Sequence, residues 1–165
     1  LKYYFQAAEV QKHDQNPNVA IIYSNIGQAY NKLGKQNKAL EYHFKSFEIR
    51  KQVFQDNHPD IAESYSGIGR VYFSQKEYDK ALEYHFKALE INKSVFHENH
   101  PDMAICYFDI ANVFNCQGKQ KEARDYYSKS LEIRKLVYGE NHPDTIIVED
   151  EIKALLNNSR NEKNQ

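Results

Sequence analysis

The chain has 165 residues, 41% of them hydrophobic, so it is long and apolar enough for one domain with its own core. Acidic and basic residues nearly balance, with a formal net charge of −1. This balance excludes the dominant basic surface that nucleic-acid binding requires, and it gives no attraction to an anionic membrane. No stretch approaches the roughly 18 apolar residues of a membrane span. We therefore predict neither a nucleic acid nor a membrane as partner.

A short motif recurs along the chain at a fixed distance. The phrase Asn57-His58-Pro59-Asp60 returns at residues 99–102 and at 141–144, 42 residues later each time, and a weaker copy, Asn16-Pro17-Asn18, precedes the first by the same distance. A fixed period of this size is typical of a repeat array. We expect a polar, frayed tail over residues 157–165. The rest should form a single array over residues 1–156, made of a half repeat (1–16), three full repeats (17–58, 59–100 and 101–142) and a closing half repeat (143–156).

Each full repeat predicts two helices. The first begins at the proline, whose fixed φ and missing N–H suit the first helical position, and an aspartate in the first turn favours the helix dipole. In the repeat 59–100 we expect the first helix to end near Gln75 and the second to run from about Tyr78 to Phe96, because apolar residues recur at helical spacing. The two half repeats add one second helix and one first helix, so we predict about eight helices. Because neither helix of a pair buries its apolar stripe alone, neighbouring pairs must stack.

The residues inside the repeats carry a family resemblance. The tetratricopeptide pattern is a large aromatic, then x2-Leu-Gly-x2-Tyr, then Ala-x3-Phe. The first repeat resembles it in Tyr23-x2-Ile26-Gly27-x2-Tyr30 with Ala39-x3-His43, and the later repeats follow in the same register at residues 65–85 and 107–127. The 42-residue length and the His-Pro-Asp start resemble the repeats of kinesin light chains and nephrocystin-like proteins. The resemblance implies an all-α fold, a right-handed α-solenoid of antiparallel helix pairs.

Two positions of this pattern have a packing explanation. A glycine inside a helix costs about 1 kcal/mol relative to alanine, so Gly27 and Gly69 are acceptable if a partner helix comes too close for a side chain. His43 and His85 stand at the aromatic position of the second helix, where we expect them to pack rather than to react.

The resemblance also implies where a ligand would bind, because the first helices of tetratricopeptide arrays line a concave face. There Phe73 and Phe108 would anchor an apolar side chain, Arg70 would pair with an acid, and amides would bond a peptide backbone. The kinesin light chain pattern has an asparagine at the sixth position, where this chain has Asn25, Gly67 and Asp109. The predicted peptide-binding residues are Ser24, Asn25, Gln28, Asn31, Lys32, Glu63, Ser66, Arg70, Phe73, Phe108, Asp109 and Asn112.

The repeated histidines resemble a metal-binding series, but their spacing argues against one. His58, His100 and His142 lie in separate repeats, and packed helices are about 8–10 Å apart, whereas an ion binds its ligands at roughly 2 Å. We interpret them as residues of the loop and the helix start. No nucleophile with a neighbouring base is recognisable, and no glycine loop for a nucleotide follows a strand. We predict no metal, no cofactor and no enzymatic activity.

Two cysteines, Cys106 and Cys116, lie ten residues apart in one predicted helix, about 15 Å and too far for a disulfide. Free thiols fit a reducing compartment, so we expect a cytoplasmic protein. The leading hypothesis is a protein-interaction scaffold that binds a peptide or helix segment of a partner protein in its concave groove. The alternative is a structural module that self-associates head to tail through exposed repeat faces.

Overall fold

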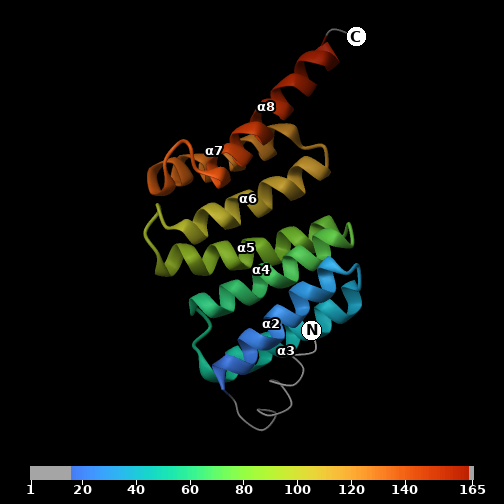
Figure 1. Ribbon diagram of the computed structural model, residues 1–165, viewed down its shortest axis with the longest axis vertical. Helices are drawn as coiled ribbons and strands as arrows, with labels where there is room; N and C mark the ends of the chain where they lie inside the picture. The colour runs from blue at the N-terminus through green and yellow to red at the C-terminus, as the bar shows by residue number, and fades with distance from the viewer. Residues whose placement is uncertain (1–15, 164–165) are drawn as a thin grey trace. The chain divides into compact units, whose positions relative to one another are not determined.

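Seven helices, without a strand, make up residues 16–163, the part of the chain that the computed structural model describes (Figure 1). The predicted all-α fold class is therefore confirmed. The second helix predicted over residues 1–16 falls almost entirely on residues that lie outside this range. The helices are α2 (Pro17–Lys32), α3 (Gln36–Val53), α4 (Pro59–Ser74), α5 (Tyr78–Val95), α6 (Pro101–Cys116), α7 (Gln120–Tyr138) and α8 (Pro143–Lys163).

The chain forms two compact units, which we describe separately. The N-terminal unit ends at Val95 and contains α2 to α5, and the C-terminal unit starts at Phe96 and contains α6 to α8. The two helices of each repeat pack against each other, α2 with α3, α4 with α5 and α6 with α7 (Figure 1). In addition α3 and α2 each contact α4, and α7 contacts α8. The predicted pairing of first and second helices is thus present in both units.

A proline and a side-chain cap start each first helix. In the N-terminal unit, His58 Nδ1 accepts a hydrogen bond from the backbone N–H of Asp60 at 3.1 Å, and its ring stacks on Phe54 with centroids 4.0 Å apart. Asn16 Oδ1 caps α2 in the same way. The other two histidines of the motif cap their helices identically, which confirms that they are helix-start residues: His100 accepts from Asp102 and His142 from Asp144, both at 3.2 Å.

Replacing His58 with alanine is expected to lower the free energy of unfolding by about 1 kcal/mol, the usual loss when an N-cap acceptor is removed. His58→Asn should keep most of the stability, because Asn16 caps α2 at the same position of the repeat. Urea denaturation followed by circular dichroism measures both variants. Equal losses in the two would show that the ring stacked on Phe54, rather than the cap, matters at this position.

A histidine ring fills the space between two glycines of the N-terminal unit. His43, on α3, is 2% exposed. A Cβ built on Gly27 of α2 would lie 2.7 Å from the Cδ2 atom of this ring, and one built on Gly67 of α4 would lie 2.7 Å from its Nδ1 atom. Both distances are shorter than any normal contact, so only glycine allows the three helices to approach this closely. Gly69 has the same relation to His85, at 2.8 Å, which confirms the packing expected for Gly27 and Gly69.

Tyr127 occupies the matching position in the C-terminal unit. Its side chain is fully buried in a core cluster with Ala111 of α6 and with Val148 and Leu155 of α8. Burial raises the pKa of its hydroxyl group well above the ordinary value. The aromatic position of the second helix is therefore a packing position in both units, filled by a histidine in one and a tyrosine in the other.

The last helix is longer than the sequence indicated. We expected a helix over residues 143–156 and a frayed tail from residue 157, whereas α8 continues to Lys163. No proline or glycine interrupts residues 144–163. Extending an existing helix fixes one residue for each hydrogen bond gained, while the costly nucleus is already formed. Polar composition alone was therefore a poor guide to where this helix ends.

Candidate functional site

The predicted binding residues of the N-terminal unit lie on α2 and α4, which contact each other directly. Phe73, near the end of α4, has its ring centroid 6.0 Å from that of Tyr78 on α5, so its own helix pair covers part of the ring. Each of the two helices carries one exposed cation on this surface. The exposed predicted residues are Gln28, Lys32, Glu63 and Arg70, and the half-buried ones are Asn25, Asn31 and Phe73.

Two predicted binding residues of this unit are not accessible. Ser24 and Ser66 are 5% and 7% exposed, so a ligand would have to displace a helix to reach their hydroxyl groups. Gly67, beside Ser66, is buried against the ring of His43. The prediction is corrected at both serines. The family resemblance assigned them to the face, but it does not show how closely neighbouring helices pack in this chain.

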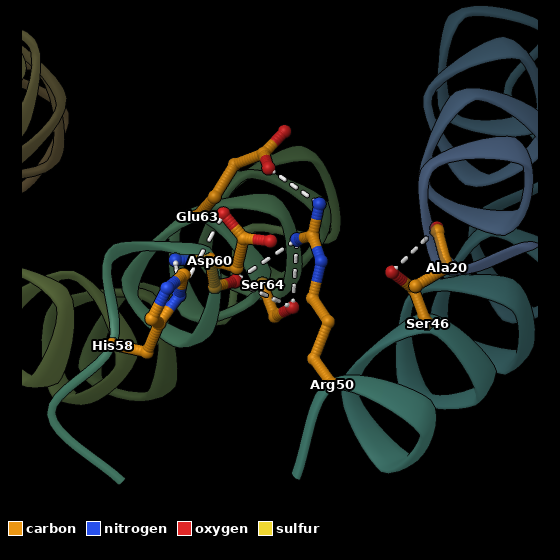
Figure 2. A network of polar contacts seen from close by, with 7 residues as sticks. All are labelled: Ala20, Ser46, Arg50, His58, Asp60, Glu63 and Ser64. Atoms are coloured by element: carbon orange, nitrogen blue, oxygen red, sulfur yellow. Dashed lines mark hydrogen bonds and ion pairs between the residues drawn. The ribbon is translucent and has the colours of Figure 1, made fainter. Parts of the chain in front are cut away.

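A buried arginine engages Glu63, another predicted binding residue (Figure 2). Arg50, near the end of α3, is 1% exposed. Its Nη1 atom donates to the carbonyl oxygen of Asp60 at 3.0 Å and to Ser64 Oγ at 2.9 Å, and its Nη2 atom donates to Glu63 Oε2 at 2.5 Å. Charge-assisted hydrogen bonds of this kind are strong. Glu63 therefore neutralises a cation of its own chain, which weakens its attraction for a cationic ligand group.

The positive charge of this surface comes from lysine and arginine, not from histidine. Burial, and then the nearby guanidinium groups of Arg70 and Arg50, lower the pKa of His43 to about 4. The imidazole is therefore neutral at physiological pH, and its Nδ1 atom has no hydrogen-bond partner among the described residues. His43 fills space inside the unit, while Arg70 on α4 places charge at the surface.

Three predicted residues lie on α6 in the C-terminal unit, and all are half-buried: Phe108, Asp109 and Asn112. The ring centroid of Phe108 lies 5.7 Å from that of Tyr127 and 5.0 Å from the guanidinium carbon of Arg134. The hydroxyl group of Tyr127 donates a hydrogen bond to Asn112 Oδ1, with 2.6 Å between the two oxygen atoms. The NH₂ group of Asn112 can therefore donate to a ligand carbonyl. Phe108 is therefore already a neighbour of a cation, rather than a bare apolar anchor.

Two arginines that shape these surfaces were not predicted from the sequence. Arg50 and Arg134 stand at the same position of the first and third full repeats, each directly after an isoleucine. Arginine is seldom fully buried, so each one taken singly indicates a surface position. The two arginines recur two repeats apart, at a position next to residues of the predicted core. This recurrence is the sequence signal that could have indicated a structural role.

An open pocket of about 290 Å³ lies where α2 turns into α3. Residues 34–38 and Gln75 line it, and none of the predicted binding residues does. It is therefore a different part of the N-terminal unit from the predicted binding face.

Packed pairs of helices of similar length, in which each first helix begins at a proline after a side-chain cap, define this chain as an α-helical repeat protein. A family model described as tetratricopeptide repeat matches residues 18–94 and again residues 60–136. The chain belongs to the tetratricopeptide repeat family. None of the curated protein sequences matches it significantly. Over the described residues, no helix combines the length and the apolar character that crossing a bilayer requires.

Solved structures share this fold at low sequence identity. The TPR-like repeats of a kinesin light chain candidate from P. anserina align with a TM-score of 0.77 and 17% identity, over 85% of this chain and 66% of that one. For BtubC (BKLC) from P. vanneervenii the TM-score is 0.80 and the identity 19%, over 92% and 62% of the two chains. For RapI without ligand the TM-score is 0.80 and the identity 16%, over 96% and 56%. The chain thus spans less than two thirds of the length of each of these proteins, and the likeness establishes the fold.

Proposed function

We propose that this chain binds a peptide or a short helix of a partner protein along the first helices of its repeats. The observation that carries the proposal is the surface of the N-terminal unit, where α2 and α4 contact each other. There Lys32 and Arg70 place a cation on each helix, Gln28 offers an exposed amide, and Phe73 presents a half-buried ring. Amides bond a peptide backbone, guanidinium groups bond acids, and aromatic rings supply apolar contact area.

The family and the thiols support this proposal. Proteins built from tetratricopeptide repeats generally act as non-enzymatic scaffolds, in line with the predicted absence of catalysis. Cys106 is buried and Cys116 exposed, and neither forms a disulfide, which fits a protein that works in the reducing cytoplasm.

A peptide screen tests the proposed surface. We expect peptides recovered with the wild-type protein to bind Arg70→Glu and Phe73→Ala at least about tenfold more weakly, the effect of losing about 1.4 kcal/mol at a binding hot spot. Lys93→Glu, a charge reversal at an exposed position of the second helix α5, is the matched control and should leave affinity unchanged. Peptides that bind the wild type and both α4 variants equally well would place binding elsewhere on the chain.

A second function, head-to-tail self-association, is favoured by exposed apolar side chains of the C-terminal unit. Leu136 of α7 and Ile146, Ile147 and Leu156 of α8 are all exposed. Grouped apolar residues at a surface mark contact sites. Sedimentation velocity over a hundredfold range of protein concentration separates the two functions, because an assembling module gives larger species as concentration rises, and a binding module remains a monomer.

A further inference from the structure

A buried arginine of the C-terminal unit lacks the side-chain partners that its counterpart has. Arg134, on α7, stands two repeats after Arg50 and is 8% exposed. Its Nη1 atom donates to the carbonyl oxygen of Asp144 at 2.8 Å, as Arg50 Nη1 donates to that of Asp60. This shared bond puts both guanidinium groups at the same place, against the first turn of the following first helix.

Hydrocarbon replaces the two side-chain acceptors around Arg134. Glu63 and Ser64, which bond Arg50, correspond to Ile147 and Val148 of α8. Val148 is fully buried, and Ile147 is 48% exposed. Among the described residues, Arg134 keeps one backbone acceptor and the neighbouring ring of Phe108, and it forms no ion pair. A cation withdrawn from water without a counter-charge is costly, so this site is electrostatically incomplete.

The sequence of the second full repeat differs at the arginine position, where it has the neutral Asn92. Ile105 and Cys106 stand at the sequence positions that match Glu63 and Ser64, so no carboxylate follows Asn92 at that distance. In the first repeat the cation and the carboxylate are both present, and in the second both are missing. In the third repeat the cation, Arg134, is present, but the side-chain acceptors that match Glu63 and Ser64 are missing. A hydrogen-bond acceptor supplied by a ligand would explain why an arginine stands there.

Three carboxylates of α8 that follow Ile147 in the sequence have other neighbours. Glu149 Oε1 pairs with Lys135 at 2.7 Å, and Asp150 Oδ1 pairs with Lys153 at 3.1 Å. Glu151 lies close enough to Tyr127 to add to the rise in the pKa of that hydroxyl group, after the larger effect of burial. On α8 the residue that corresponds to Glu63 is Ile147, and among the described residues no carboxylate pairs with Arg134.

We propose that Arg134 binds a carboxylate of the ligand, from an acidic side chain or a peptide C-terminus, with Phe108 and Ile147 as the apolar walls of the subsite. A guanidinium group holds a carboxylate through two parallel hydrogen bonds, a geometry that an ammonium group cannot reproduce. The ligand oxygen would take the place that Glu63 Oε2 has beside Arg50. The proposal rests on the proposed function and adds to it a preference for acidic peptides.

Titration with sodium acetate tests the subsite without knowledge of the natural ligand. We expect the side-chain Nε–Hε signal of Arg134 in ¹⁵N-labelled protein to shift and saturate, while that of Arg50, already paired with Glu63, stays in place. Ile147→Glu supplies the missing carboxylate from an exposed position of the chain itself and should abolish the shift. Ile147→Gln is the matched neutral control and should keep it. An unmoved Arg134 signal, an equal shift at Arg50, or an Ile147→Glu variant that responds like the wild type would overturn the proposal.

The peptides recovered in the screen distinguish the subsite from the proposed function. Acidic peptides should bind Ile147→Glu at least about tenfold more weakly than the wild type. The same loss should follow when the glutamate of the peptide is changed to glutamine or its C-terminus is amidated, and which change acts identifies the source of the carboxylate. Peptides that are weakened by Arg70→Glu but ignore Ile147→Glu and amidation would remove the subsite and leave the proposed function. Acetate bound at Arg134 with no peptide recovered would remove the peptide-binding function alone.

Discussion

Replacing Arg50 with alanine is expected to lower the free energy of unfolding by about 3 kcal/mol or more, because a buried side chain and charge-assisted hydrogen bonds are lost together. The guanidinium group joins the end of α3 to the first two turns of α4 through Asp60, Glu63 and Ser64. Its removal leaves a cavity and an enclosed hydroxyl and carbonyl with fewer partners. Urea denaturation at neutral pH, followed by circular dichroism, measures the loss.

Two variants separate the contributions to this loss. Arg50→Met keeps most of the volume and removes the hydrogen bonds, so it should retain part of the stability that Arg50→Ala loses. Arg134→Ala is the matched control in the C-terminal unit, where one backbone acceptor replaces the three acceptors of Arg50. It should therefore cost clearly less. Equal losses in Arg50→Ala and Arg134→Ala would show that the carboxylate and hydroxyl partners of Arg50 add little to stability.

Acidification from pH 7 to pH 4 is expected to reduce the free energy of unfolding by about 3 kcal/mol through His43 alone. The pKa of His43 is about 4 in the folded protein, mainly because the ring is buried, whereas an imidazole in an unfolded chain has a pKa near 6.5. Above pH 6.5 the ring is neutral in both states, and the contribution is complete. Between pH 6.5 and pH 4 the unfolded chain binds a proton that the folded one does not, so stability falls. Below pH 4 both states are protonated and the loss stops.

The variant His43→Phe isolates this contribution, because it keeps a ring of similar shape and cannot titrate. Other groups also respond to acid. The pKa of Glu149, for example, is lowered chiefly by its hydrogen bond to Lys135. The informative quantity is therefore the difference between the two proteins in unfolding free energy across pH 4.5, 5.5 and 6.5. The value for the wild type minus the value for His43→Phe should become lower as the pH falls, and parallel curves would contradict the assigned burial of a neutral His43.

The fold was predictable because its determinants are local and repeated. Pro59, Pro101 and Pro143 fix where first helices start, and the caps before them are short-range contacts that depend on residues two positions apart. The glycines of the pattern, Gly27 and Gly69, indicated close helix packing that the structure confirms. Only the end of α8 was misjudged, where no proline or glycine marks a stop.

The binding surface was less predictable because it depends on distances between helices. Ser24 and Ser66 match the positions that line the face in the family pattern, but both are buried in this chain. Whether Glu63 attracts a ligand depends on Arg50, which lies 13 residues earlier on another helix. Gly67 stands where the kinesin light chain pattern has an asparagine, and the structure gives the reason, since the ring of His43 leaves no room for a side chain. Such couplings between helices do not show in the spacing of residues along one helix.

Because the ring of His43 fits between two glycines, the 42-residue segments of this chain cannot be exchanged freely for one another. In the C-terminal unit the same ring position holds the larger Tyr127, beside Ala111 and with Glu151 near its hydroxyl. The 42-residue segments are therefore alike in backbone but not interchangeable in their junctions. Suppose that segment 101–142 replaced segment 17–58. The phenol ring of Tyr127 would then lie against Gly67, in a space that the smaller imidazole ring of His43 fills completely in this chain. A repeat can therefore be added or lost only where the ring of its second helix still fits the residues of the first helix that follows. For His43 this residue is Gly67.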